Sequence, residues 1–136
     1  MGRVLGIDYG DKRVGFAISD ELEMVATPLG VHTRAKAGDD VAAVLELCRE
    51  WNVARIVVGE PLNMDGSSGA AVDKVHEFVG RLEECSPVEI LLWDERMSTM
   101  SAERVLIEGN ISRRRRKGVV DKLAAQIILQ NYLDSL

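Results

Sequence analysis

Hydrophobic positions in the first third of the chain fall into short runs that are typical of β-strands. Two of these runs, at about 3–8 and 13–19, flank a short link that contains glycine and aspartate, which predicts a β-hairpin. A third run covers about 24–31 and contains Pro28. Because proline has no backbone donor, this strand should lie at a sheet edge or carry a bulge at that point.

After a polar loop at 32–38, the apolar spacing changes to the period of an α-helix, which Asp39 or Asp40 should cap. Asn52 suits a left-handed stop at the end of this helix. The continuous apolar run 55–59 then predicts a strand buried on both faces, parallel to its neighbour and reached by a right-handed crossover. The apolar face of the helix consists of Val41, Val44, Leu45 and Cys48.

The same succession of helix and strand repeats in the second half of the chain. A long loop at 60–69 leads to another helix, and Pro87 separates that helix from a strand at 88–93. His76 lies on the apolar stripe of this helix, where a packed or half-exposed side chain is expected rather than a metal ligand. The stripe consists of Val72, Val75, His76, Val79 and Leu82.

Two further helices are expected after the strand at 88–93. Ser98 or Thr99 should cap the first, which ends near 109–110. A run of basic residues follows, and the final helix begins after Gly118, so that Asp121 lies in its first turn, where a favourable interaction with the helix dipole is the alternative to a functional role. The apolar faces consist of Ala102, Val105 and Leu106 in the first helix, and of Val120, Leu123, Ala124, Ile127, Ile128 and Leu133 in the second.

This order of elements predicts one α/β domain over residues 1–136. Three antiparallel N-terminal strands and two parallel strands would form a mixed five-stranded sheet flanked by helices. The 136 residues are 46% hydrophobic, which is ordinary for a globular protein, and no repeat or linker divides them.

Cysteine use and the N-terminal segment favour a cytoplasmic protein. Cys48 and Cys85 lie far apart in predicted helices without metal-ligand spacing, as reduced thiols do. The first three residues lead straight into a strand, without the apolar segment of a signal peptide. No apolar run reaches the length that spans a membrane.

Acidic residues stand at the ends of predicted elements that should meet at one edge of the sheet. Asp8 ends the first strand between glycines, Asp94 and Glu95 follow the last strand, and Asp121 begins the final helix. Open α/β sheets bind ligands at the carboxyl ends of their strands, and carboxylates hold the metal ions of phosphodiester hydrolysis. The alternative role for Asp8 is a turn residue that caps its own backbone.

The distribution of charge points to a possible nucleic-acid contact. The net charge of −5 gives the chain no general attraction for nucleic acid. One run of five consecutive cations is nevertheless suited to a phosphate backbone, with a solvated loop as the alternative. It consists of Arg113, Arg114, Arg115, Arg116 and Lys117.

Four ordered motifs make nearly the whole chain similar to the YqgF (RuvX) family. The resemblance implies an RNase H-like fold related to that of the Holliday-junction resolvase RuvC. Family members are described as Holliday-junction resolvases and as nucleases that mature the 5′ end of pre-16S ribosomal RNA. The motifs are Gly6-Ile7-Asp8-Tyr9-Gly10-x-Lys12-Arg13-x-Gly15-x-Ala17-x-Ser19-Asp20, Val57-Val58-Gly59-x-Pro61-Leu62-Asn63-Met64-Asp65-Gly66, Asp94-Glu95-Arg96-x-Ser98-Thr99 and Asp121-x-x-Ala124-Ala125-x-x-Ile128-Leu129-Gln130.

The resemblance implies catalytic roles for Asp8, Asp94, Glu95 and Asp121, with Asp8, Glu95 and Asp121 as the metal-ligand set. Strand alternation puts Asp94 and Glu95 on opposite faces, so only one should reach the metal, and which one stays open. Oxygen ligands suit Mg2+ or Mn2+, and two ions would activate a water and stabilise the leaving oxygen. Glu60 stands where the family usually has an apolar residue, as either an extra ligand or a surface residue.

Several polar side chains are expected to contact the nucleic acid. Besides the basic run, they are Lys12, Arg13, Asn63 and Arg96. For Arg96 the alternative role is to hold a neighbouring carboxylate.

The chain is therefore expected to be a hydrolase, a metal-dependent nuclease that acts in pre-16S rRNA maturation. Holliday-junction resolution is the first alternative, and it would require a homodimer, because a junction needs two active sites. A non-catalytic nucleic-acid-binding assembly factor is the second. A sugar-kinase-like ATPase fits less well, because the chain has one such domain and no Gly-Lys-Ser/Thr phosphate loop.

Overall fold

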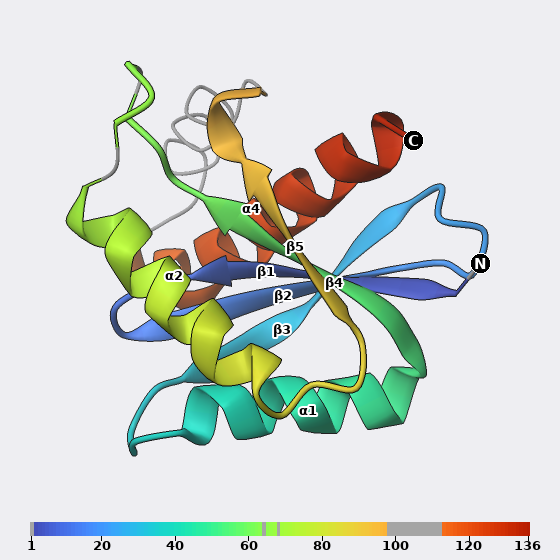
Figure 1. The fold of residues 1–136 in the computed structure, drawn as a ribbon, viewed down its shortest axis with the longest axis horizontal. Helices are drawn as coiled ribbons and strands as arrows, with labels where there is room; N and C mark the ends of the chain where they lie inside the picture. The colour runs from blue at the N-terminus through green and yellow to red at the C-terminus, as the bar shows by residue number, and fades with distance from the viewer. Residues whose placement is uncertain (1, 64, 68, 98–112) are drawn as a thin grey trace.

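In the computed structural model, which describes residues 2–63, 65–67, 69–97 and 113–136, five strands form one mixed sheet (Figure 1). The strand order is β3-β2-β1-β4-β5. The pairs β1–β2 and β2–β3 are antiparallel, whereas β1–β4 and β4–β5 are parallel, which confirms the predicted sheet. The strands are β1 (Arg3–Tyr9), β2 (Arg13–Ser19), β3 (Ala26–Thr33), β4 (Val53–Glu60) and β5 (Glu89–Asp94).

The edge strand β3 combines both predicted consequences of Pro28. Pro28 pairs with Ala17 and Gly30 pairs with Phe16, so the intervening residue of β3 is an extra one, as in a bulge. The strand begins two residues later than predicted. The backbone amides of residues 24 and 25 donate instead to the carboxylate of Asp20, which keeps this part of the hairpin loop out of the ladder.

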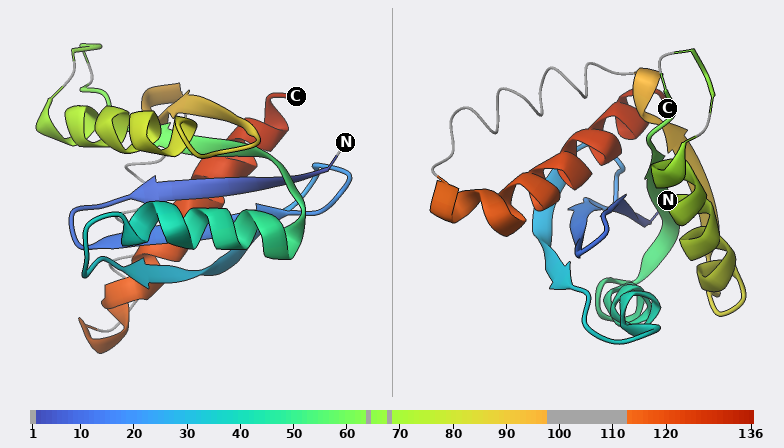
Figure 2. Two further views of the ribbon diagram at one scale, coloured as in Figure 1. Left: turned by 60° about the horizontal axis from the view of Figure 1, so that its bottom comes forward. Right: turned by 90° about the vertical axis from the view of Figure 1, so that its left-hand side faces the viewer.

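Two helices cover one face of the sheet and a third crosses the other face (Figure 2). Helices α1 (Asp39–Trp51) and α2 (Ala70–Glu83) share the first face, and α4 (Arg113–Asp134) covers the second. No helix in these described ranges is both long and apolar enough to cross a bilayer. The helix predicted between Ser98 and 110 lies outside the described residues.

The start of α1 differs from the prediction. Its N-cap is Gly38, in the left-handed conformation with φ 81°, and no side chain caps the helix. The Asp39 carboxylate instead accepts hydrogen bonds from the amides of Ala35 and Lys36, in the preceding loop. The predicted left-handed stop at Asn52 is confirmed, with φ 52°.

The final helix begins earlier than predicted, which corrects the position of Asp121. Helix α4 starts at Arg113, so the backbone of the basic run is helical and Gly118 lies inside the helix. A glycine there costs only about 1 kcal/mol, which a long packed face easily offsets. Asp121 is therefore well beyond the first turn, and the predicted interaction with the helix dipole is wrong.

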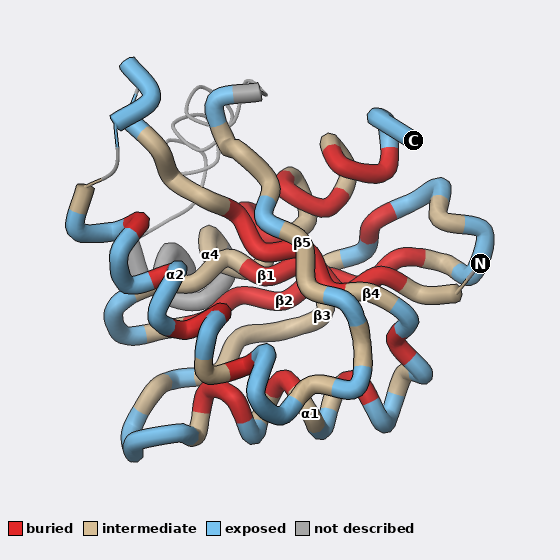
Figure 3. Tube along the Cα trace, viewed as in Figure 1, coloured by how far each residue is buried: buried red, intermediate tan, exposed pale blue. Residues whose placement is uncertain are grey.

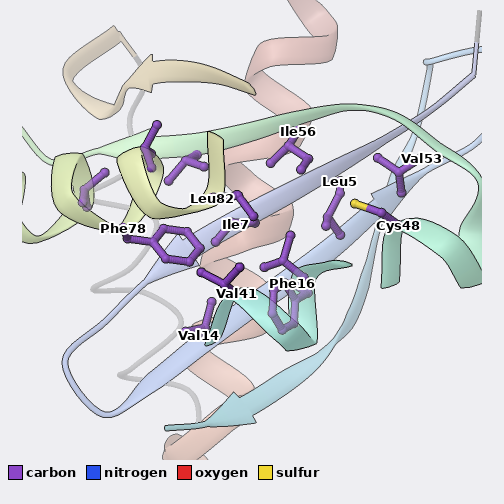
Figure 4. Packing of buried hydrophobic residues seen from close by; sticks show 14 of the residues in the cluster. Leu5, Ile7, Val14, Phe16, Val41, Cys48, Val53, Ile56, Phe78 and Leu82 are labelled. Atoms are coloured by element: carbon purple, nitrogen blue, oxygen red, sulfur yellow. The ribbon is translucent and has the colours of Figure 1, made fainter. Parts of the chain in front are cut away.

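The core has two layers, one on each face of the sheet. The central strands are buried along most of their length (Figure 3). Between the sheet and α1 and α2, the packing is mostly aliphatic around Phe16 and Phe78 (Figure 4). On the other face α4 packs very closely, since a Cβ on Gly6 would lie 2.7 Å from the Cβ of Leu129. Glycine at position 6 thus permits the close approach of α4 to β1.

Candidate active site

Asp8 lies at the carboxyl end of the central strand β1, on the face that α4 covers. Its antiparallel partner is Gly15, and a Cβ on Gly15 would lie 2.1 Å from the backbone oxygen of Asp121 in α4. Directly paired residues point to the same face of a sheet. The half-buried Asp8 side chain therefore points to the α4 face, beside the helical turn that carries Asp121.

Glu95 reaches the same face from β5. Gly59, near the end of β4, pairs with Trp93, and Glu95 begins the short 3-10 helix η1 (Glu95–Met97) just beyond β5. A Cβ on Gly59 would lie 2.6 Å from Cδ1 of Ile128 in α4 and 3.1 Å from Oε2 of Glu95. Because Gly59 has no side chain, there is room beside it for the Glu95 carboxylate.

Asp94 is held on the opposite face. It pairs in register with Glu60, whose carboxylate contacts Nε2 of His76 in α2. Arg96 donates to Asp94 from its backbone amide at 2.9 Å and from Nη2 at 2.8 Å, and this hydrogen-bonded guanidinium lowers the pKa of the Asp94 carboxyl. Of the two neighbouring acids, Glu95 thus shares a face with Asp8, whereas Asp94 and Glu60 do not.

Asp121 forms an ion pair with a residue that was expected to contact nucleic acid. Nε of Arg13 donates to Oδ2 of Asp121 at 2.7 Å. Both side chains are partly buried, at 31% and 21% exposure. Arg13 stands two residues before Gly15 on β2, so it also points to the α4 face. A protein cation therefore balances the charge of Asp121 in this structure.

The acids on the α4 face do not form a ready metal-binding cluster. Across the part of the chain that the structure describes, no three His, Cys, Asp or Glu side chains lie close enough to hold a metal ion. The donor set of Asp8, Glu95 and Asp121 fits a hard divalent cation by its chemistry, because all of its ligand atoms are carboxylate oxygens. In this structure the three carboxylates are not close enough together to share one metal ion, and Asp121 is paired with Arg13.

A partly buried polar cluster around Asp40, which the sequence patterns did not indicate, holds the end of β1 from the other face. The Tyr9 hydroxyl donates to Asp40 at 2.8 Å, and Arg81 donates to both Asp40 oxygens at 3.0 and 3.1 Å. Burial opposes ionisation of Asp40, but these hydrogen bonds outweigh it and lower the pKa of Asp40 to about 2. Burial and the bond to Asp40 raise the pKa of Tyr9 to about 12.

The β1–β2 turn that follows Asp8 is anchored to this cluster. The guanidinium of Arg34 lies over the Tyr9 ring and donates to the backbone oxygens of Gly10 and Asp11 at 3.0 and 2.9 Å. In the sequence, the only sign of the cluster was an aspartate at the start of a helix, which has the same appearance as a helix cap.

The remaining predicted nucleic-acid contacts have separate locations. Lys12 is exposed in the β1–β2 turn. Asn63 closes its own loop, with Nδ2 donating to Oγ of Ser67 at 3.0 Å. Arg96 lies against that loop, since its Nη1 is 3.3 Å from the Cβ position of Gly66. The side chains of Arg113, Arg114, Arg115, Arg116 and Lys117 lie outside the described residues, although their backbone forms the start of α4.

Solved structures with low sequence identity share this arrangement of sheet and helices. One is Thermus thermophilus RuvC in complex with a Holliday-junction substrate, with a TM-score of 0.62 at 17% identity over 99% of this chain and 95% of that one. The fowlpox virus Holliday-junction resolvase has a TM-score of 0.54 at 12% identity, covering 98% of this chain and 99% of its own. These similarities show that the fold is the RNase H-like fold of RuvC-type resolvases.

Sequence relatives are much closer and cover nearly the whole chain. A protein of Halothermothrix orenii named "Putative pre-16S rRNA nuclease" is 47% identical over 132 residues, which are 97% of this chain and 94% of its own. A protein of the same name from Caldanaerobacter subterraneus subsp. tengcongensis is 48% identical over 134 residues, 98% of this chain and 96% of its own. The family model RuvX, described as Holliday junction resolvase, matches residues 2–135. The chain belongs to the RuvX family.

Proposed function

We propose that this protein is a metal-dependent nuclease that hydrolyses phosphodiester bonds in the 5′-end maturation of pre-16S rRNA, in the cytoplasm. The observation that carries the proposal is that Asp8 at the end of β1, Glu95 just beyond β5 and Asp121 in α4 share one face of the sheet, near the carboxyl ends of its parallel strands. The names of the relatives at 47% and 48% identity support the substrate.

Asp8, Glu95 and Asp121 would hold Mg2+ or Mn2+, which supplies an activated water and stabilises the leaving 3′ oxygen. The protein's own contribution is to gather these negative charges on one face. Asp8 is fixed by the central strand and by the anchored turn that follows it. Arg13 offsets the charge of Asp121, which limits the repulsion among the acids before any cation binds.

The resolution of DNA junctions is the second candidate. It is favoured by the description of the family model and by the fold shared with RuvC. This activity would need two active sites in one assembly, and hence a two-fold dimer. Sedimentation of the purified protein with and without a four-way DNA junction would test that requirement.

Cleavage of two substrates in parallel tests the proposal. The purified protein is incubated with an RNA carrying the 5′ precursor segment of small-subunit rRNA, or with a four-way DNA junction, in Mn2+, Mg2+ or EDTA. Asp8→Asn should lose metal-dependent cutting of the RNA. Asp11→Asn is the matched control, because Asp11 lies in the turn that follows Asp8 but pairs with Lys74 at 2.6 Å.

Each outcome decides between the candidates. RNA cutting that depends on metal and on Asp8 supports the maturation nuclease, whereas junction cutting with the same dependence supports the resolvase. Binding of RNA without cutting would overturn the catalytic proposal and favour a non-catalytic assembly factor. Cutting by Asp8→Asn at the wild-type rate would remove Asp8 from the mechanism.

A further inference from the structure

Exposed apolar side chains gather at the end of the sheet opposite the candidate active site. Five large hydrophobic residues are exposed among those that the structure describes, and four of them lie at this end. Leu22, Met24 and Val25 belong to the β2–β3 hairpin loop, with 63%, 65% and 58% exposure, and Leu136 lines the same hollow as Leu22 and Met24. This loop lies near the C-terminal end of α4 and far from the β1–β2 turn (Figure 1). Such clustering marks an interaction site more often than scattered apolar residues do.

Three hollows meet at this end of the molecule. One, of about 510 Å³, is lined by Arg3, Leu22 and Trp51 among others. A second, of about 360 Å³, shares Leu22 with the first and extends to Leu133 and Leu136. A third, of about 360 Å³, shares Trp51 with the first and runs between β3 and α1. Because neighbouring hollows share residues, they lie next to one another, and the three together are named here the hairpin-end groove.

The hairpin-end groove carries a net negative charge. Among its described lining residues, Arg3 is the single cation, and it already faces Glu21 at 4.0 Å. Acidic residues occur in all three hollows. They are Glu21, Glu23, Glu46, Glu50 and Asp134. Arg3 balances Glu21 and an ion pair with Arg55 balances Glu23, so the excess negative charge comes from Glu46, Glu50 and Asp134.

This charge decides among the classes of occupant. An acidic rim repels a phosphate backbone. It also disfavours a second copy of this chain, because a two-fold contact would bring the same acidic surface against itself. Lysine or arginine around a large apolar anchor is complementary to both the charge and the exposed side chains.

We propose that the hairpin-end groove docks a segment of another protein in which lysine or arginine flanks large apolar side chains. The apolar anchors of the segment pack against Leu22, Met24 and Trp51, and its cations face the acidic rim. Such a partner would also bring positive charge to a chain whose own net charge is −5. The proposal is independent of the nuclease activity, because the groove is at the other end of the sheet.

Selection from a displayed peptide library against the full-length protein tests this docking site. Peptides enriched by wild type are synthesised and titrated by calorimetry against wild type, Leu22→Ser/Met24→Ser and Leu92→Ser. Leu92 is the matched control, because among the described residues it is the one exposed large hydrophobic residue outside the cluster, at 41% exposure. All three positions are exposed, so these variants should fold, which circular dichroism checks.

The enriched peptides should combine basic and large apolar residues. Their affinity should fall about tenfold or more in Leu22→Ser/Met24→Ser, as for a truncated hot spot, and should not change in Leu92→Ser. Their binding should also weaken as salt is raised. The proposal is overturned if nothing is enriched, if the peptides are acidic, or if the double variant binds them normally. Sedimentation showing a dimer that Leu22→Ser/Met24→Ser dissociates would also overturn it, in favour of a second copy as the occupant.

Discussion

The Glu95 carboxylate lies 3.1 Å from the point at which a Cβ on Gly59 would stand. Gly59→Ala should therefore displace Glu95, together with the end of the Ile128 side chain. Both neighbours are flexible ends, so the fold should survive with a loss of about 1–2 kcal/mol. Nuclease activity should fall by about tenfold to a hundredfold, because a small misplacement of a ligand is costly.

The control for that substitution is Gly80→Ala. A Cβ on Gly80 meets nothing within 4 Å, and alanine favours a helix interior. Activity should stay at the wild-type level, and the melting temperature should rise slightly. Equal losses of activity in Gly59→Ala and Gly80→Ala would contradict a role for the space above Gly59.

Gly15→Ala should be more damaging to stability than Gly59→Ala. The new Cβ would lie 2.1 Å from the backbone oxygen of Asp121, so α4 itself would have to move. We expect a loss of about 3 kcal/mol or more in the free energy of unfolding, measured by urea denaturation. Gly30→Ala, where nothing lies within 4 Å, should cost little. A Gly15→Ala protein of wild-type stability would show that α4 does not approach β2 this closely.

Arg13 should compete with metal ions for Asp121, to which it donates at 2.7 Å. Arg13→Gln would remove this cation and should tighten Mn2+ binding by about threefold to tenfold, measured by calorimetry without substrate. Because the pair is partly exposed, stability should change by no more than about 1 kcal/mol. Lys74→Gln removes an equal charge from the pair with Asp11 and should leave Mn2+ affinity almost unchanged. Weaker Mn2+ binding by Arg13→Gln would mean that Arg13 positions Asp121 rather than competing for it.

The Asp40 cluster should make stability sensitive to acid. The pKa of Asp40 is lowered from 3.8 to about 2 in the folded protein. The ionised Asp40 carboxylate therefore stabilises the fold fully above pH 3.8, and this contribution is lost as the pH falls from about 4 to about 2 and Asp40 becomes protonated. Its full size is about 2 kcal/mol.

Urea denaturation of wild type and Asp40→Asn at pH 5, 4 and 3 measures this contribution. Asp40→Asn should be less stable at pH 5, and the gap between the two proteins should narrow as the pH falls. Asp73→Asn, which changes an acid in the first turn of α2, serves as the control. A gap that stays constant with pH would mean that Asp40 is not ionised in the fold.

The strands and the helices α1 and α2 were predictable because each has a local pattern. Alternation and continuous apolar runs mark the strands, and Pro28 indicated the edge and the bulge of β3. The start of α4 was not predictable from such patterns. A glycine inside a cationic segment looks like a helix boundary, and no local pattern indicates that the helix continues through it.

The residues of the candidate site could be proposed from the sequence, but their pairings could not. Strand ends and the family motifs indicate Asp8, Asp94, Glu95 and Asp121, and they leave open which of Asp94 and Glu95 would hold a metal. The partner of Asp121 is 108 residues away in the chain, and the Arg81–Asp40 bond joins residues 41 apart. Contacts of this range leave no local pattern. The choice of Glu95 over Asp94 depends on the space above Gly59, which also becomes visible only in three dimensions.

The most direct test of the account compares Glu95→Gln with Asp94→Asn. Both remove one negative charge from adjacent residues, and cleavage rates of the pre-16S precursor RNA in Mn2+ are measured for each. Because Glu95 shares a face with Asp8 and Asp121, Glu95→Gln should lose about a hundredfold or more in kcat. The double variant Glu95→Gln/Asp8→Asn should lose no more than Glu95→Gln alone, because the acids act as one unit. Asp94→Asn should retain activity within about tenfold, through a loosened Arg96. Near-wild-type cleavage by Glu95→Gln, with activity abolished in Asp94→Asn, would contradict the proposed site.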